Sequence, residues 1–192
     1  MFDEAIAQLQ VPGAIGVIPT DTVYGVVARA RDPAAVERLY RLKQRQAKPG
    51  TLIAADIEQL VGLGIKRRYL TAVDRFWPGA VSVVIPCGPE LSYLHQGLNS
   101  LAVRLPAEPS LRGLLVASGP LLTSSANPPN QPPASTVAEA EDYFKQSVDF
   151  YVDGGDLSGR QPSTLLRIVD DAIVILRKGA VNIDEATGRY GS

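Results

Sequence analysis

Short apolar runs alternate along the chain with amphipathic segments that begin at capping residues, and this alternation constrains the fold most. The clearest run is AVSVVI at residues 80–85, whose β-branched side chains favour a strand. The clearest helix start is Asp32-Pro33, because an Asp caps the first turn and the missing N–H of proline costs nothing there. Some of the expected strands are adjacent along the chain. The pattern therefore predicts an α/β protein with a mixed sheet rather than a pure βαβ array.

The same signals predict where the elements lie. We expect strands at residues 14–18, 52–55, 80–85, 101–105, 121–123, 150–152, 165–169 and 172–176, the last two forming a hairpin across Asp170-Asp171. We expect helices at residues 2–10, 33–43, 67–76, 109–117 and 136–145, and a further one capped by Asp56 with Gln59 three residues on. A chain of 192 residues, 45% of them hydrophobic, fits a single domain over residues 1–192 with a buried core.

Composition excludes several classes of protein. Lys plus Arg is 19 and Asp plus Glu is 20, which argues against a protein that coats nucleic acid through bulk charge, although a local basic pocket stays open. The single cysteine, Cys87, excludes an internal disulfide framework and favours a reducing compartment, so we expect a cytoplasmic protein. Residues 1–10 do not resemble a signal peptide, and no segment approaches the length of a membrane span. His95 is the only histidine, so we expect no histidine-based metal site.

Three cations follow the helix expected at residues 33–43. Lys43 continues the apolar face of that helix, and Arg45 and Lys48 come next in LKQRQAKPG, just before an apolar strand. Cations grouped beside a buried strand are typical of a pocket for an anion such as phosphate. A solvated charged surface, with Lys43 beside the helix C-terminus, explains the stretch equally well.

Two other polar stretches allow similar alternatives. PTDTVYG at residues 19–25 places hydroxyls and a carboxylate at the end of a strand, which fits either a small-molecule site or an ordinary side-chain turn. Arg104 lies inside the apolar strand LAVRLP, and alternation puts it with Ala102 on the face opposite Leu101 and Val103. It is then either exposed to solvent or paired with a carboxylate ligand. Arg177, in VILRKG, presents the same choice.

Taken in order, these stretches resemble the YrdC-like threonylcarbamoyl-AMP synthase family, also called TsaC. The similarity runs from about residue 13 to residue 179 and is carried by motifs that are weak singly and specific together. The motifs are PTDTVYG at 19–25, Lys-x-Arg at Lys43 and Arg45, SLAVRLP at 100–106, Ser-x-Asn at Ser125 and Asn127, DGG at 153–155, PST at 162–164 and LRKG at 176–179.

The resemblance implies a twisted mixed sheet with surrounding helices and a large concave cavity. It also implies a nucleotidyltransferase reaction in which L-threonine, bicarbonate and ATP give threonylcarbamoyl-adenylate and pyrophosphate. The adenylate then passes to tRNA-modifying transferase proteins, and contact with tRNA or double-stranded RNA is expected of such an enzyme. Mg²⁺ is expected with ATP, held by phosphates and water, with no metal held by the protein itself.

The resemblance further implies roles for residues that match its motifs. For L-threonine these are Thr22, Arg104, Thr123 and Ser163. For ATP they are Lys43, Arg45, Lys48, Ser100, Ser125, Asn127 and Arg177, with Lys43 and Arg45 expected to be catalytic.

The sequence departs from the family pattern at two places. Arg45 is followed by QAKPGT, so Lys48 is the best match for a further ATP contact. Ser-x-Asn is followed by Pro128-Pro129-Asn130, where relatives often have Leu-Ser-Gly. Two other functions stay open: an RNA-binding or ribosome-maturation module that uses the same basic cavity, and a carbamoyl-adenylating enzyme of hydrogenase maturation. The second carries zinc-finger and acylphosphatase regions that do not occur in this sequence.

Overall fold

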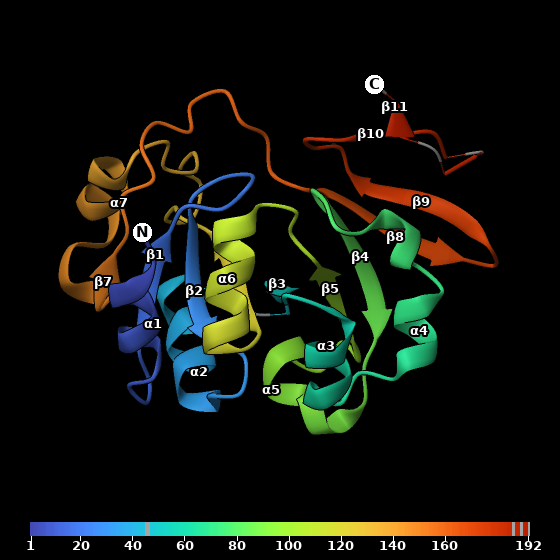
Figure 1. The fold of residues 1–192 in the computed structure, drawn as a ribbon, viewed down its shortest axis with the longest axis horizontal. Coiled ribbons are helices and arrows are strands. Elements are labelled where there is room, and N and C mark those ends of the chain that lie inside the picture. The colour runs from blue at the N-terminus through green and yellow to red at the C-terminus, as the bar shows by residue number, and fades with distance from the viewer. Residues whose placement is uncertain (45–46, 186, 189, 192) are drawn as a thin grey trace.

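The computed structural model describes residues 1–44, 47–185, 187–188 and 190–191. Its strands are β1 (Ile15–Ile18), β2 (Gly25–Arg29), β3 (Thr51–Ile53), β4 (Val81–Pro86), β5 (Ser100–Arg104), β6 (Leu121–Ser125), β7 (Phe150–Tyr151), β8 (Thr164–Val169) and β9 (Ala172–Arg177). They form one nine-stranded sheet in the order β7-β1-β2-β6-β3-β5-β4-β8-β9 (Figure 1). Two short strands, β10 (Asn182–Ile183) and β11 (Tyr190–Gly191), form a separate ladder.

The sheet is mixed, as predicted. β1 pairs with β7, β3 with β5 and β4 with β8 in parallel, and the remaining neighbours are antiparallel. The β8–β9 hairpin turns at Asp170 and Asp171, whose φ angles of 48° and 63° fit the two-residue turn expected there.

The helices are α1 (Asp3–Leu9), α2 (Pro33–Leu42), α3 (Ile57–Leu63), α4 (Arg67–Thr71), α5 (Ser92–His95), α6 (Pro109–Ser118) and α7 (Val137–Phe144). Three short 3₁₀ turns cover Asp74–Phe76, Pro89–Leu91 and Lys145–Ser147. The expected caps are present: Asp32 accepts hydrogen bonds from Ala34 N and Ala35 N at 3.0 and 3.1 Å. Asp56 and Thr136 cap α3 and α7 in the same way.

Two apolar clusters lie on opposite faces of the sheet. On one face, α1 and α6 pack against Ile18, Val27 and Leu121 of neighbouring strands. On the other, α2, α3, α4, α5 and α7 join a larger cluster that includes Val26 and Leu122. Adjacent residues of β2 and β6 thus contribute to different clusters, as the alternation of side chains along a strand requires.

The first of these faces is covered by α1 and α6 over only part of its width. Strand register places Thr51, Ala102 and Thr123 side by side on it, with Arg104 beside Ile53. After β7 the chain runs across the top of the molecule in Figure 1 to reach β8 near the opposite edge of the sheet. The uncovered part of this face, together with the crossing segment 152–163, carries the site described below.

Two expectations about elements were wrong. Residues 25–29, where no strand was expected, form β2, which pairs antiparallel with both β1 and β6. The helix expected at residues 67–76 is instead α4 followed by a 3₁₀ turn, because Val73 leaves helical geometry at φ −126° and ψ 5°. No helix in the described ranges is both long and apolar enough to cross a bilayer.

Candidate functional site

A cavity of about 400 Å³ lies on the uncovered face of the sheet. It brings together all four side chains expected to contact an amino acid, although they lie up to 141 positions apart in the chain. These four, with the two expected nucleotide contacts that also line it, are Thr22, Arg104, Thr123, Ser163, Ser125 and Arg177. Gly25 lines the same cavity, and a Cβ at this position would lie 2.5 Å from Thr123 Oγ1, so the absence of a side chain keeps the wall in place.

Arg104 is buried in the cavity wall, with 3% of its surface exposed. Its Nη1 forms an ion pair with the carboxylate of Asp21, and its buried Nε has no hydrogen-bond partner. Of the two alternatives left by the sequence, solvent exposure is therefore wrong. The prediction that Arg104 and Ala102 share one face of the strand is confirmed, and that face of β5 is turned toward the cavity rather than toward water.

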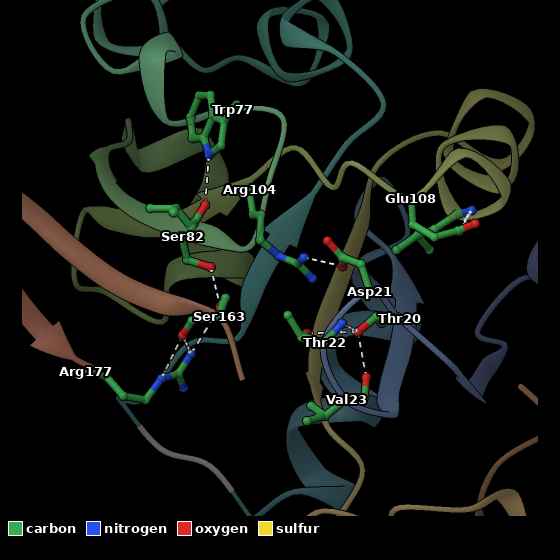
Figure 2. Close-up of polar contacts among 12 residues, drawn as sticks. Thr20, Asp21, Thr22, Val23, Trp77, Ser82, Arg104, Glu108, Ser163 and Arg177 are labelled. Atoms are coloured by element: carbon green, nitrogen blue, oxygen red, sulfur yellow. Dashed lines mark hydrogen bonds and ion pairs between the residues drawn. The ribbon is translucent and has the colours of Figure 1, made fainter. Parts of the chain in front are cut away.

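The turn that carries Asp21 is held by its own threonines. Thr20 Oγ1 donates to Val23 O at 2.6 Å, accepts from Thr22 N at 3.2 Å and lies 3.0 Å from Thr22 Oγ1 (Figure 2). The two readings of PTDTVYG are thus not exclusive: a side-chain turn is present, and its Thr20 and Thr22 also line the cavity.

Tyr24 connects this turn to the crossing segment. Its hydroxyl accepts from Gly154 N at 2.8 Å and donates to Gly155 O at 2.9 Å, while its ring is fully buried. Burial raises the pKa of the Tyr24 phenol; the Gly154 N–H opposes this and the nearby Asp153 carboxylate adds to it. The phenol therefore stays protonated and able to donate at neutral pH.

Ser163 lies at the end of the crossing segment, between two strands. Its Oγ is 2.8 Å from Ser82 Oγ, and Arg177 Nη2 donates to Ser163 O at 2.8 Å and to Ser163 Oγ at 3.2 Å (Figure 2). Arg177 is thereby attached to the cavity wall through Ser163.

Lys43 is almost fully buried and does not lie on a solvated surface. Its Nζ donates to Ser125 O at 2.7 Å, to Asn127 Oδ1 at 3.0 Å and to Asn127 O. Asn127 in turn accepts from Ser125 Oγ at 2.7 Å and donates to Gln131 O at 2.7 Å. The buried ammonium thus fixes the exit of β6, since a charge removed from water needs such partners.

A second cavity, of about 410 Å³, adjoins this exit and is lined by Lys43, Lys48, Asn127 and Pro128 among others. It therefore holds three of the expected nucleotide contacts. Ser100 begins β5 on the same face as Ala102 but lines neither cavity in the described part of the chain. Arg45 lies outside the described residues.

The remaining titratable candidates are structural. Burial raises the pKa of the Cys87 thiol to about 11, which leaves it unreactive at neutral pH. His95 is buried, its Nδ1 accepts from Gly97 N and Asn99 N, and its Nε2 lies 3.1 Å from Gly88 O. Within the described ranges there is no group of three or more His, Cys, Asp or Glu side chains that could hold a metal ion.

Sequence reasoning did not assign roles to two residues of the site. Asp21 was noted only as a carboxylate at a strand end, and its pairing with Arg104 spans 83 positions. Ser82 is a lone hydroxyl inside the apolar run AVSVVI, and this is the one sequence signal for its role, because a buried hydroxyl needs a partner.

Comparison with known proteins identifies the family of this chain. The family model Sua5_yciO_yrdC, described as "Telomere recombination", matches residues 8–179. A threonylcarbamoyl-AMP synthase of Bacillus subtilis (strain 168) is 33% identical over 90% of this chain and 52% of its own length. One from Stutzerimonas stutzeri (strain A1501) is 31% identical over 90% of this chain and 95% of its own length.

A solved structure of Pyrococcus abyssi Sua5 complexed with L-threonine superimposes with a TM-score of 0.83, at 29% identity, covering 95% of this chain and 55% of that one. Escherichia coli YciO gives a TM-score of 0.78 at 26% identity, covering 92% of this chain and 87% of its own. The chain thus spans about half the length of some relatives, such as the Bacillus protein, and nearly all of others. The extent of the family match, together with the mixed sheet and the motif residues gathered on one face of it, shows that this chain belongs to the Sua5/YciO/YrdC family.

Proposed function

We propose that this protein is a threonylcarbamoyl-AMP synthase, which makes threonylcarbamoyl-adenylate and pyrophosphate from L-threonine, bicarbonate and ATP. Two things support the proposal: relatives with this name align over 90% of the chain, and the related Pyrococcus protein was solved with L-threonine. The observation that carries it furthest is Arg104, a buried guanidinium with an unpartnered Nε in a cavity lined by hydroxyls.

The first cavity suits an amino acid that carries a carboxylate and a hydroxyl. Arg104 would pair with the carboxylate, and the hydroxyls of Thr22, Thr123 and Ser163 would bind the polar groups around it. A volume of about 400 Å³ is of the size found for small-molecule sites.

The nucleotide would lie beside the amino acid, toward the second cavity. The proposed contacts are Lys43, Arg45, Lys48, Ser100, Ser125, Asn127 and Arg177. Lys43 now donates to oxygens of the β6 exit, so a phosphate contact requires it to share or exchange one of these partners. Ser125 lines the first cavity and Lys43 lines the second, and Lys43 Nζ donates to Ser125 O, which would bring the two substrates close together.

The chemistry then depends on placement more than on proton transfer. The amine of threonine would add to the carbon of bicarbonate, and water would leave to give a carbamate. A carbamate oxygen would then attack the α-phosphate of ATP, with pyrophosphate as the leaving group. Cations and hydroxyls around such a centre hold the reactants in line and offset developing charge. Mg²⁺ would enter bound to the phosphates and water and supply further charge neutralisation, which fits a donor set rich in Lys, Arg and hydroxyl groups. The adenylate would pass to tRNA-modifying transferase proteins.

The test is to incubate the protein with ATP, labelled bicarbonate and one amino acid at a time, and to measure pyrophosphate. Release that depends on threonine and is lost in Arg104→Gln supports the proposal. Arg45→Ala tests the phosphate assignment more cleanly than Lys43→Ala, because Lys43 also holds the β6 exit in place. Absence of release together with tight RNA binding would instead identify an RNA-binding module.

A further inference from the structure

Asp21 is the hydrogen-bond partner of the most deeply buried cation in the cavity. The side chains of Arg104 and Asp21 are 3% and 12% exposed, and Arg104 Nη1 contacts Asp21 Oδ1. Figure 2 shows Arg104 projecting from β5 between the Ser82–Ser163 pair and the turn that carries Asp21. In the described part of the chain, Asp21 is the one residue bonded to this guanidinium.

The contact occupies one corner of the guanidinium and leaves the opposite edge intact. A guanidinium has five N–H donors, and a carboxylate can bind two of them side by side, on Nε and Nη2 or on the two Nη atoms. Since Asp21 holds Nη1, the pair formed by Nε and Nη2 remains, and Nε is buried without a partner. An unpaired buried donor costs free energy, which a bound carboxylate would recover.

Asp21 itself does not line the cavity, whereas Arg104 does. The other carboxylate drawn near it, Glu108, is engaged elsewhere: its oxygens accept hydrogen bonds from Ser110 N and Leu111 N at the start of α6. Asp21 therefore supplies the negative charge that offsets the free-energy cost of burying Arg104. It contacts the guanidinium at Nη1 from outside the cavity.

We propose that Asp21 is a positioning residue, which holds Arg104 by Nη1 so that the Nε–Nη2 edge is presented to the carboxylate of the amino-acid substrate. This inference rests on the proposed function, because it takes L-threonine as the ligand. Residues that orient a ligand-binding group can change affinity about tenfold to a hundredfold when mutated, as the outer-shell partners of metal ligands do.

The experiment compares two ligands that differ only at the carboxylate. Binding of L-threonine and of L-threoninol, which carries a CH₂OH group in place of the carboxylate, is measured by calorimetry for the wild type, Asp21→Asn and Asp21→Glu. The matched control is Asp142→Asn, an exposed carboxylate on α7. In Asp21→Asn we expect threonine to bind about tenfold to a hundredfold more weakly while threoninol binding stays within about twofold. Asp21→Glu should recover part of the loss, and Asp142→Asn should change neither ligand.

Steady-state kinetics give a second readout. The loss in Asp21→Asn should appear in KM for threonine, with KM for ATP unchanged, because the pair lies on the amino-acid side of the site. If Asp21→Asn does not fold, as judged by circular dichroism, the same binding measurements on Asp21→Glu and on the double variant Asp21→Asn/Arg104→Gln test the positioning role. The double variant should then bind both ligands with equal weakness.

The outcomes separate this inference from the proposed function. Equal weakening of threonine and threoninol in Asp21→Asn, or no change in either, overturns the positioning role and leaves the synthase proposal standing. A wild-type protein that binds neither ligand overturns the threonine assignment and the role of Asp21 with it.

Discussion

The single hydroxyl of Tyr24 joins two parts of the site, and its removal should be measurable both in stability and in ligand binding. Tyr24→Phe keeps the buried ring and deletes the acceptor for Gly154 N and the donor to Gly155 O. Each hydrogen bond contributes about 0.5–1.5 kcal/mol net to the free energy of unfolding. Gly155 is exposed and Gly154 half-buried, so water can replace part of what is lost. We therefore expect the free energy of unfolding to fall by about 1–2 kcal/mol.

The assay is urea denaturation followed by fluorescence of Trp77, with the slope checked for two-state behaviour. The matched control is Tyr151→Phe, which deletes one exposed hydrogen bond to Lys145 O at 2.7 Å, away from the cavity. It should cost about 0.5–1 kcal/mol and leave threonine binding unchanged. Amide exchange at residues 154–155 should accelerate in Tyr24→Phe alone. A Tyr24→Phe protein with unchanged stability and unchanged exchange would refute the view that this hydroxyl anchors the crossing segment.

Two glycines and Cys87 give the remaining predictions. Gly179→Ala places a Cβ 2.2 Å from Pro162 O, so it should lower the free energy of unfolding by about 1–3 kcal/mol and weaken threonine binding through Ser163. Gly113→Ala, in α6 with open space around it, should instead raise the free energy of unfolding by about 0.5–1 kcal/mol. Urea titrations of both variants check these opposite signs. Cys87, whose pKa rises from 9.0 to about 11 on burial, should react with iodoacetamide at pH 8 about a hundredfold more slowly in the folded than in the unfolded protein. Because the pKa of this thiol is higher in the folded protein, the thiol favours the native state below pH 9.0, and that contribution is lost as the pH rises toward 11. Thermal melts across that pH range would measure the loss. Equal rates of iodoacetamide labelling in the folded and unfolded protein would contradict the burial of Cys87.

Local signals in the sequence were sufficient for most of the elements. The caps at Asp32, Asp56 and Thr136 were read correctly because a cap depends only on residues within one helical turn. The β8–β9 hairpin was read correctly because two residues between apolar runs leave few other geometries. β2 was not found because the connection that precedes it, residues 19–24, shows no two-residue turn signal and carries polar residues that resemble a loop.

The candidate site was predicted from the sequence motifs rather than from geometry. The expectation that Thr22, Arg104, Thr123 and Ser163 lie together agrees with the cavity, while their roles toward threonine stay a prediction. The pairing of Asp21 with Arg104 and of Ser82 with Ser163 could not be read from the sequence. Both connect residues more than 80 positions apart, and such pairs are set by strand order and register, which short-range patterns do not contain.

The pairing of β1 with β7, in which Gly16 lies beside Phe150, bears on how the protein is made. A ribosome adds about 5–20 residues per second, so Phe150 emerges roughly 7–27 s after Gly16. During that interval β1 can pair with β2 on one side but lacks β7, the edge strand that pairs with it on the other side. Long-range pairing of this kind is slow to form and leaves unpaired edges open to other chains. Nascent chains halted before residue 150 should therefore depend on chaperones, and binding competence should be acquired only after residue 177 has emerged.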